Sequence, residues 1–158
     1  MTNILSVFLG GILAIAGTSL VKWMEYSFER RSLRAAIKAE IGGLVDMFAR
    51  RGHSDMFRSA INSWRAEEDY DLYVFTLDEN FTPVYDANIG KVGLLGADVA
   101  GDVVKFYDLI IGVKAELRAH INGQTHRMSH ALRADRLEKL LESWAEAVDL
   151  AEALSKRL

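Results

Sequence analysis

An uncharged apolar run close to the N-terminus constrains this chain more than any other feature. Ile4 to Val21 reads ILSVFLGGILAIAGTSLV, eighteen residues without an acidic or basic side chain. As a helix, this run spans about 27 Å, close to the thickness of the hydrocarbon core of a bilayer. A helix buried in a water-soluble protein usually keeps one polar face, and this run has none. We therefore predict a transmembrane anchor over residues 1–26.

The residues after the run are those that a membrane interface selects. Lys22, Trp23 and Tyr26 follow it directly, and Arg30 and Arg31 come next. Aromatic side chains and lysines are enriched at the headgroup level, and basic residues accumulate on the cytoplasmic side. The three residues before the run carry no charged side chain. This asymmetry predicts an N-terminus outside the membrane and a C-terminal domain in the cytoplasm.

A cleaved signal peptide is the main alternative for this segment. Ala14-Ile15-Ala16 resembles the small-x-small pattern of a cleavage site. A signal peptide, however, begins with a basic region, which this chain lacks, and its apolar segment ends near the cleavage site. Here the apolar run continues past Ala16, so we favour the uncleaved anchor.

Small residues recur along one side of the predicted anchor. Without a hydrophobic force between helices in lipid, small side chains promote association because they let two backbones approach closely. The alternative is the ordinary composition of membrane helices, in which glycine is common. We predict a self-association face made of Ser6, Gly10, Ala14, Gly17 and Thr18.

The remaining residues, 27–158, have the size of one small domain. The whole chain has no cysteine, one proline and a net charge of −3. The missing cysteines exclude disulfides and thiolate metal sites, and the weak negative charge argues against a nucleic-acid partner. The scarcity of proline favours helices. We predict an all-α cytoplasmic domain.

Apolar periodicity predicts five helices in this domain. A helix over 22–51 continues the anchor and carries a stripe of Leu33, Ile37, Ile41, Leu44 and Phe48. A second, short helix has Ser54 as its N-cap, and a third starts at Thr82-Pro83 and runs to about Val92.

Two longer helices complete the predicted domain, over residues 97–120 and 129–156. The first places Val103, Phe106 and Ile110 inward, and the second places Leu132 and Leu137 inward. Their short connection predicts antiparallel neighbours. We expect an antiparallel helical bundle formed by this hairpin and the membrane-proximal helix, with the short helices covering one end.

Two histidines are the candidates for a metal site. His126 and His130 are four residues apart, a spacing that would present both imidazoles to one ion if this stretch were helical. Arg127 occupies the position where a zinc protease has its catalytic glutamate. We therefore expect a polar turn at this place, without catalytic residues, metal or cofactor.

One segment resembles a known pattern. Residues 85–95, YDANIGKVGLL, are followed by DVVKFY at 102–107. Together they resemble small uncharacterised bacterial and prophage proteins that have one N-terminal membrane helix and a helical cytoplasmic domain. The resemblance implies a location in the bacterial inner membrane and no particular activity. We also expect Asn88 to bond to backbone near a helix end, Phe106 to pack in the core and Tyr107 to face the Asn88 loop.

Three functions compatible with these features differ in class. The first is a self-associating membrane scaffold or adaptor without catalytic activity, whose partners are membrane lipids and further copies of the chain. The second is an oligomeric pore or permeabilising effector, related to phage or to defence. The third is a metal-dependent enzyme that uses the histidines. We rank them in this order, because no set of catalytic residues is visible.

Overall fold

The computed structural model describes residues 2–70, 72 and 81–158, and for residues 2–10 and Ile12 it describes the backbone only. Over these residues the only regular secondary structure is helix, with no strand, which confirms the predicted all-α class. The elements are α1 (Thr2–Arg50), α2 (His53–Arg65), α3 (Pro83–Asn88), the 3₁₀ helix η1 (Ile89–Leu95), α4 (Ala97–Ile121) and α5 (His130–Arg157).

Helix α1 is a single helix of 49 residues. The apolar run and the first helix of the domain are therefore continuous, as predicted. The helix also passes through Gly42 and Gly43 without a break. It ends at Arg50, and Gly52 then adopts a left-handed conformation with φ of 62°. Glycine takes this conformation without the steric cost that a Cβ would bring, so the chain can bend and begin α2 directly.

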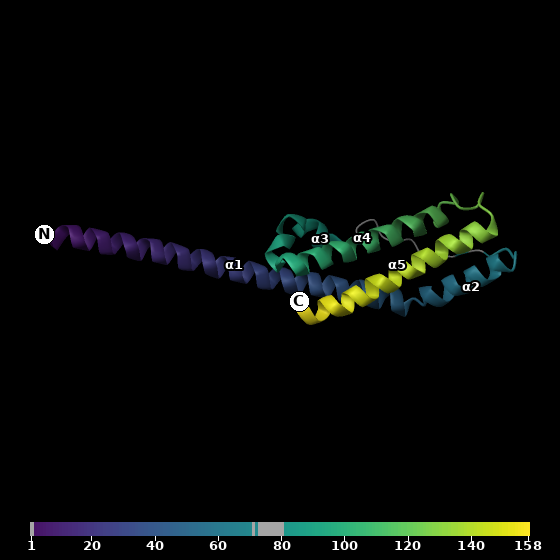
Figure 1. Ribbon diagram of the computed structural model, residues 1–158, viewed down its shortest axis with the longest axis horizontal. Helices are drawn as coiled ribbons and strands as arrows, with labels where there is room; N and C mark the ends of the chain where they lie inside the picture. Colours follow the sequence, from purple (N-terminus) through teal and green to yellow (C-terminus); the bar gives the residue numbers. More distant parts are fainter. Residues whose placement is uncertain (1, 71, 73–80) are drawn as a thin grey trace.

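Three lines of helix form the bundle (Figure 1). α2 extends the course of α1, and α5 lies antiparallel to both. Arg65 at the end of α2 contacts Glu138 near the start of α5, whereas Lys38 of α1 contacts Ser155 near its end. α4 forms the other neighbour of α5 and is antiparallel to it, which confirms the predicted hairpin.

The core lies between these three lines. The predicted stripe of α1 is buried along its whole length, and the inward residues of α4 follow the same rule. The aromatic ring of Phe48 stacks on Trp144 of α5, with 3.7 Å between ring centroids. Leu132 is an exception: it is 47 % exposed, because it lies in the first turn of α5, before the stretch that packs on α2 and α4. The buried core includes Leu33, Ile37, Ile41, Leu44, Phe48, Val103, Phe106, Ile110, Leu137 and Leu140.

Two predicted helix boundaries differ from the structure. Ser54 is not the N-cap of α2, since Gly52 occupies that position and the helix already includes His53. The third predicted helix ends earlier, at Asn88, and continues as the 3₁₀ helix η1. Ser129, the predicted first residue of the last helix, is the N-cap of α5 instead: its hydroxyl accepts a hydrogen bond from the amide of Leu132.

The short elements do not all cover one end. α3 and η1 pack beside α1 at the end where α4 begins, as Figure 1 shows. α2 is part of the main body instead, because its buried residues Phe57, Ile61 and Trp64 pack along α5. The predicted position of α2 is therefore wrong, and the bundle is longer and thinner than expected.

The first half of α1 extends beyond the bundle as a free-standing arm, residues 2–28 (Figure 1). Across the described part of the chain, no helix is both long enough and apolar enough to cross a membrane. Residues 4–10 and Ile12 of the predicted membrane segment lie outside the described side chains.

Candidate functional site

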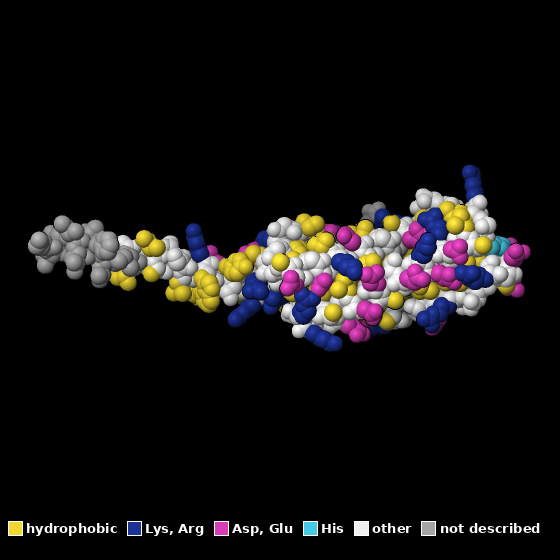
Figure 2. Space-filling view, in the orientation of Figure 1, with side chains coloured by type: hydrophobic (Ala, Val, Ile, Leu, Met, Phe, Trp, Pro, Cys, Tyr) yellow, Lys and Arg dark blue, Asp and Glu magenta, His cyan; other side chains and the backbone are white. Residues whose placement is uncertain are grey.

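Large apolar side chains cover the described part of the arm. Ile15 is 70 % exposed and Phe28 is 76 % exposed, although Phe28 lines a pocket together with Asn88 and Lys91. Figure 2 shows these side chains as yellow patches along the arm. Exposed apolar surface of this extent marks a place where lipid or another protein chain is expected. The exposed set is Leu13, Ile15, Leu20, Val21, Trp23, Met24, Tyr26 and Phe28.

The predicted membrane-interface residues lie on the arm and just beyond it. Lys22, Trp23 and Tyr26 are exposed, as an interfacial role requires. Arg30 and Arg31 lie at the base of the arm, where α1 enters the bundle; Arg31 is exposed and Arg30 is half-buried. In Figure 2, dark blue side chains gather at this junction.

Three of the five predicted self-association residues lie in the described part. Ala14, Gly17 and Thr18 are exposed, whereas Ser6 and Gly10 lie outside the described side chains. The Thr18 hydroxyl donates to the backbone oxygen of Ala14 on its own helix at 2.5 Å. The Thr18 hydroxyl is therefore not free to donate a hydrogen bond to a second helix. Association at this face would depend on close packing of the two backbones.

A half-buried carboxylate, that of Glu40, connects α1 to the start of α3. Pro83 has no N–H, so the first amides that need acceptors are those of Val84 and Tyr85. The Glu40 carboxylate accepts both, at 2.7 and 3.0 Å. Thr82 occupies the N-cap position but does not cap the helix, because its hydroxyl bonds with Asp86 instead.

Glu40 also accepts a hydrogen bond from the hydroxyl of Tyr107 on α4, at 2.6 Å. The prediction that Tyr107 faces the Asn88 loop is therefore wrong. Asn88 itself donates to the backbone oxygen of Val84, near a helix end, as predicted. The Tyr107 ring stacks on Tyr85 at 3.9 Å between centroids. Burial, together with the bond to Glu40, raises the pKa of Tyr107 far above its usual range. The tyrosine thus stays a neutral donor, and the carboxylate has three partners.

The Glu40 join could not be found from the sequence. A carboxylate directly before the buried Ile41 is an unusual neighbour, but nothing local identifies its partners, which are 44 to 67 residues away. With all its bonds made to the protein, Glu40 is a structural group. It is not placed to act as a base on a substrate.

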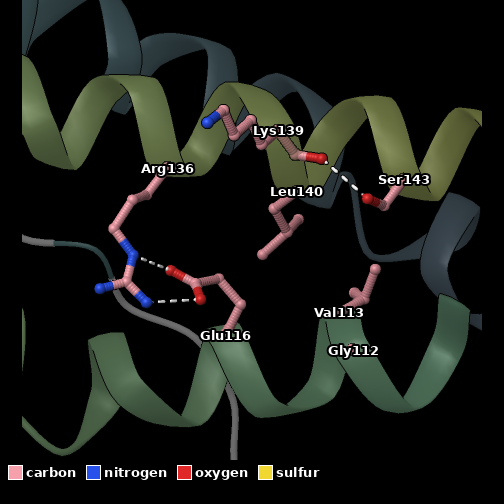
Figure 3. A pocket seen from close by; sticks show the side chains of 7 residues that line it. All are labelled: Gly112, Val113, Glu116, Arg136, Lys139, Leu140 and Ser143. Atoms are coloured by element: carbon pink, nitrogen blue, oxygen red, sulfur yellow. Dashed lines mark hydrogen bonds and ion pairs between the residues drawn. The ribbon is translucent and has the colours of Figure 1, made fainter. Parts of the chain in front are cut away.

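A pocket of about 290 Å³ opens between α4 and α5 (Figure 3). Its apolar floor is made by Val113 and Leu140, and one end is closed by an ion pair in which Glu116 accepts from Arg136 at 2.5 and 2.7 Å. Ser143 donates to the backbone oxygen of Lys139 at 3.0 Å. Glu116 and Arg136 neutralise each other, which leaves the positive charge of Lys139 among the lining residues. The Ser143 hydroxyl has no base beside it, so this geometry does not indicate catalysis.

His120 lies behind the same ion pair, near the end of α4. It is buried, its Nδ1 is 3.0 Å from the Thr125 hydroxyl, and its Nε2 is 3.8 Å from Glu116 without a hydrogen bond. Burial lowers the pKa of His120 even though Glu116 acts in the opposite direction. The imidazole is therefore a neutral part of the core at the end of the hairpin.

The predicted histidine pair is not brought together by a helix. Ser129 is the N-cap of α5, whose first residue is His130, so His126 lies in the preceding turn. The two histidines are therefore not on one helix, which was the condition for binding a shared ion. His130 Nε2 lies instead 3.2 Å from Asp69. Within the described residues, no group of three or more His, Cys, Asp or Glu side chains could hold a metal ion.

The arm and the basic residues where α1 enters the bundle are thus the part of the molecule best suited to bind a partner. Comparison with known proteins adds no relative: no protein-family model matches the chain, and neither does any curated protein or solved structure.

Proposed function

We propose that this protein is a membrane-anchored, self-associating helical scaffold or adaptor without catalytic activity. Its arm spans the bacterial inner membrane, its N-terminus lies outside, and its helical bundle lies in the cytoplasm. Lipids and further copies of the same chain are its partners. The bundle then serves as the surface that the assembly presents to the cell interior.

One observation carries this proposal. The arm continues α1 out of a packed bundle, and its described large apolar side chains are exposed around the helix, while the charged Lys22 and Glu25 lie at the end nearer the bundle. Each such side chain gains about 1.5–3 kcal/mol on leaving water. A bilayer covers all sides of a single helix at once, which a groove on another protein does not.

The orientation is supported by the charges. Lys22, Arg30 and Arg31 follow the apolar run, and none of the residues before it is charged. Self-association is supported by the small-residue face, on which an added Cβ at Gly17 would meet no described atom within 4 Å. A second helix could therefore approach the backbone closely there.

Membrane insertion is tested by charging the arm. Leu13→Lys combined with Ile15→Lys should release the protein from the membrane pellet after ultracentrifugation of lysed cells, because each lysine costs about 2.5–3.5 kcal/mol near the bilayer centre. The matched control is Ile111→Lys with Leu132→Lys, which also replaces two exposed apolar residues, but on the bundle. The wild type and this control should remain in the pellet. An unaltered chain that stays in the supernatant without detergent would overturn the proposal.

Self-association is tested by mass measurement in mild detergent. The unaltered chain should be oligomeric, and Ala14→Leu should shift it towards monomer. Ala16→Leu is the control, since these two alanines lie roughly 160° apart around the helix. A monodisperse monomer across a broad concentration range would remove the scaffold. Leakage of dye from vesicles that contain the protein would favour the pore instead.

A further inference from the structure

One face of α1 at the base of the arm is strongly basic. Arg30, Arg31, Arg34 and Lys38 fall within an arc of roughly 100° when successive residues are placed 100° apart. The nearest acidic residues of this helix, Glu25 and Glu29, lie outside that arc. Glu29 is paired with Lys91 at 2.7 Å, on the side of the helix that faces η1.

The fold adds a further charge to this face from the other end of the sequence. Lys38 Nζ donates to the backbone oxygen of Ser155 at 2.6 Å, which places the last turn of α5 beside α1. Lys156 is exposed in that turn. Arg157 is paired with Asp102 and is therefore already partly neutralised. We call Arg30, Arg31, Arg34, Lys38 and Lys156 the basic face.

Carboxylates do not neutralise the basic face in the described part of the chain. Arg34 donates one bond, from Nη2 to the backbone oxygen of Leu95 at 3.3 Å, while the Nε atoms of Arg30 and Arg34 are buried without a partner. Both side chains are half-buried, so a ligand would meet the accessible part of each guanidinium group and not its buried Nε. Guanidinium groups are suited to phosphate oxygens, which accept two parallel hydrogen bonds.

The position of the basic face along α1 is that of a headgroup layer. Trp23 lies on the same side of the helix, nearer the arm, and exposed apolar surface continues as far as Phe28. Arg30 follows Phe28 by two residues, which is about 3 Å along the axis. Long basic side chains can also bend back towards the interface, and a modest helix tilt brings one face closer still.

We propose that the basic face is a binding site for the phosphate-bearing headgroups of anionic phospholipids. This inference rests on the membrane placement proposed above and deepens it, since it names the lipid class and the residues. Four of the charges belong to α1 and one to α5, so the α5 charge is added to the site only when the bundle is folded. Lipid binding would accordingly hold the end of α5 and the base of the arm against the membrane surface.

The test uses the fluorescence of Trp23 in the full chain reconstituted into vesicles. Vesicles contain phosphatidylcholine and phosphatidylglycerol in equal amounts, with bromine, which quenches tryptophan, on one lipid or on the other. Trp64 and Trp144 are buried in the bundle and supply a constant background. We expect brominated phosphatidylglycerol to quench more strongly, with a relative binding constant about fivefold above that of phosphatidylcholine at low salt.

Matched variants locate the effect. Arg31→Gln with Lys38→Gln and Lys156→Gln should bring the two lipids to equal quenching, whereas Arg58→Gln with Arg118→Gln and Arg127→Gln removes three exposed charges elsewhere on the bundle and should preserve the preference. Circular dichroism checks that both triple variants remain folded, and an unfolded one is replaced by its three single variants.

The outcomes separate the two proposals. If neither brominated lipid quenches Trp23, the membrane placement fails and this inference fails with it. If both lipids quench equally in the unaltered protein, the placement stands and the lipid site is overturned. If both triple variants lose the preference to the same degree, the effect belongs to total charge and not to the basic face, which also overturns the site.

Discussion

The two halves of α1 share one backbone geometry but have opposite surroundings. In the arm, residues 2–28, apolar side chains occur on all sides and the described ones are exposed. In the second half, residues 29–50, apolar side chains recur every three or four positions and the stripe from Leu33 to Phe48 is buried. The comparison teaches that helix formation alone does not reveal burial: the period of the apolar pattern does.

The largest difference between the two halves is expected when one isoleucine in each is truncated to alanine. Ile37 is fully buried, so Ile37→Ala should lower the free energy of unfolding of the bundle by about 2–5 kcal/mol, because it leaves a cavity. Ile15→Ala should change it by less than about 0.5 kcal/mol. Denaturant unfolding in detergent, followed by near-UV circular dichroism, measures both. Equal losses would mean that the arm is part of the bundle core.

A smaller effect is expected when the hydrogen bonds that Glu40 of α1 accepts from α3 and α4 are altered. Glu40→Gln replaces one accepting oxygen by an amide that faces a donor, so we expect a loss of about 1–3 kcal/mol. Glu142→Gln on the exposed side of α5 is the control and should be nearly neutral. Combining Glu40→Gln with Tyr107→Phe should cost less than the sum of the two single changes, since the two groups share a hydrogen bond. Full additivity would contradict the join.

Helix starts in the bundle depend on local capping. Ser129→Ala removes the cap of α5 and should lower the free energy of unfolding by about 1 kcal/mol. Ser143→Ala, in the middle of the same helix, removes only a hydroxyl that bonds back to Lys139 and should be neutral or slightly stabilising. Thermal unfolding of the two variants side by side distinguishes them. An equal shift in both would show that the Ser129 hydroxyl does not cap α5.

The smallest effect is expected in a pH titration of stability. It concerns the bundle alone, because histidine occurs in the bundle and not in residues 2–28. Burial lowers the pKa of both His53 and His120 below the ordinary value of 6.5. The unfolded chain therefore binds more protons than the folded one just below this value, and the free energy of unfolding should fall as the pH drops from 7.5 to 5.5. His53→Phe with His120→Gln should flatten this slope, and a slope left unchanged would show that other groups cause it.

Local rules predicted most of the helices. The stripe from Leu33 to Phe48, the beginning of the last helix to within one residue and the antiparallel hairpin follow from periodicity and loop length, which act over a few residues. The errors fall where a distant group changes a local rule. Thr82 was expected to cap α3, but Glu40 supplies the acceptor, and Tyr107 bonds to that carboxylate and not to the Asn88 loop.

The helical class, the continuous first helix and the contrast between its uncharged apolar run and its periodic half could be read from the sequence alone, because these depend on residues adjacent along the chain. Only the tertiary structure decided which carboxylate caps α3, where α2 lies and how the end of α5 meets Lys38 of α1. Each of these needs groups that are far apart in sequence to meet, and the packing of the whole bundle selects those meetings.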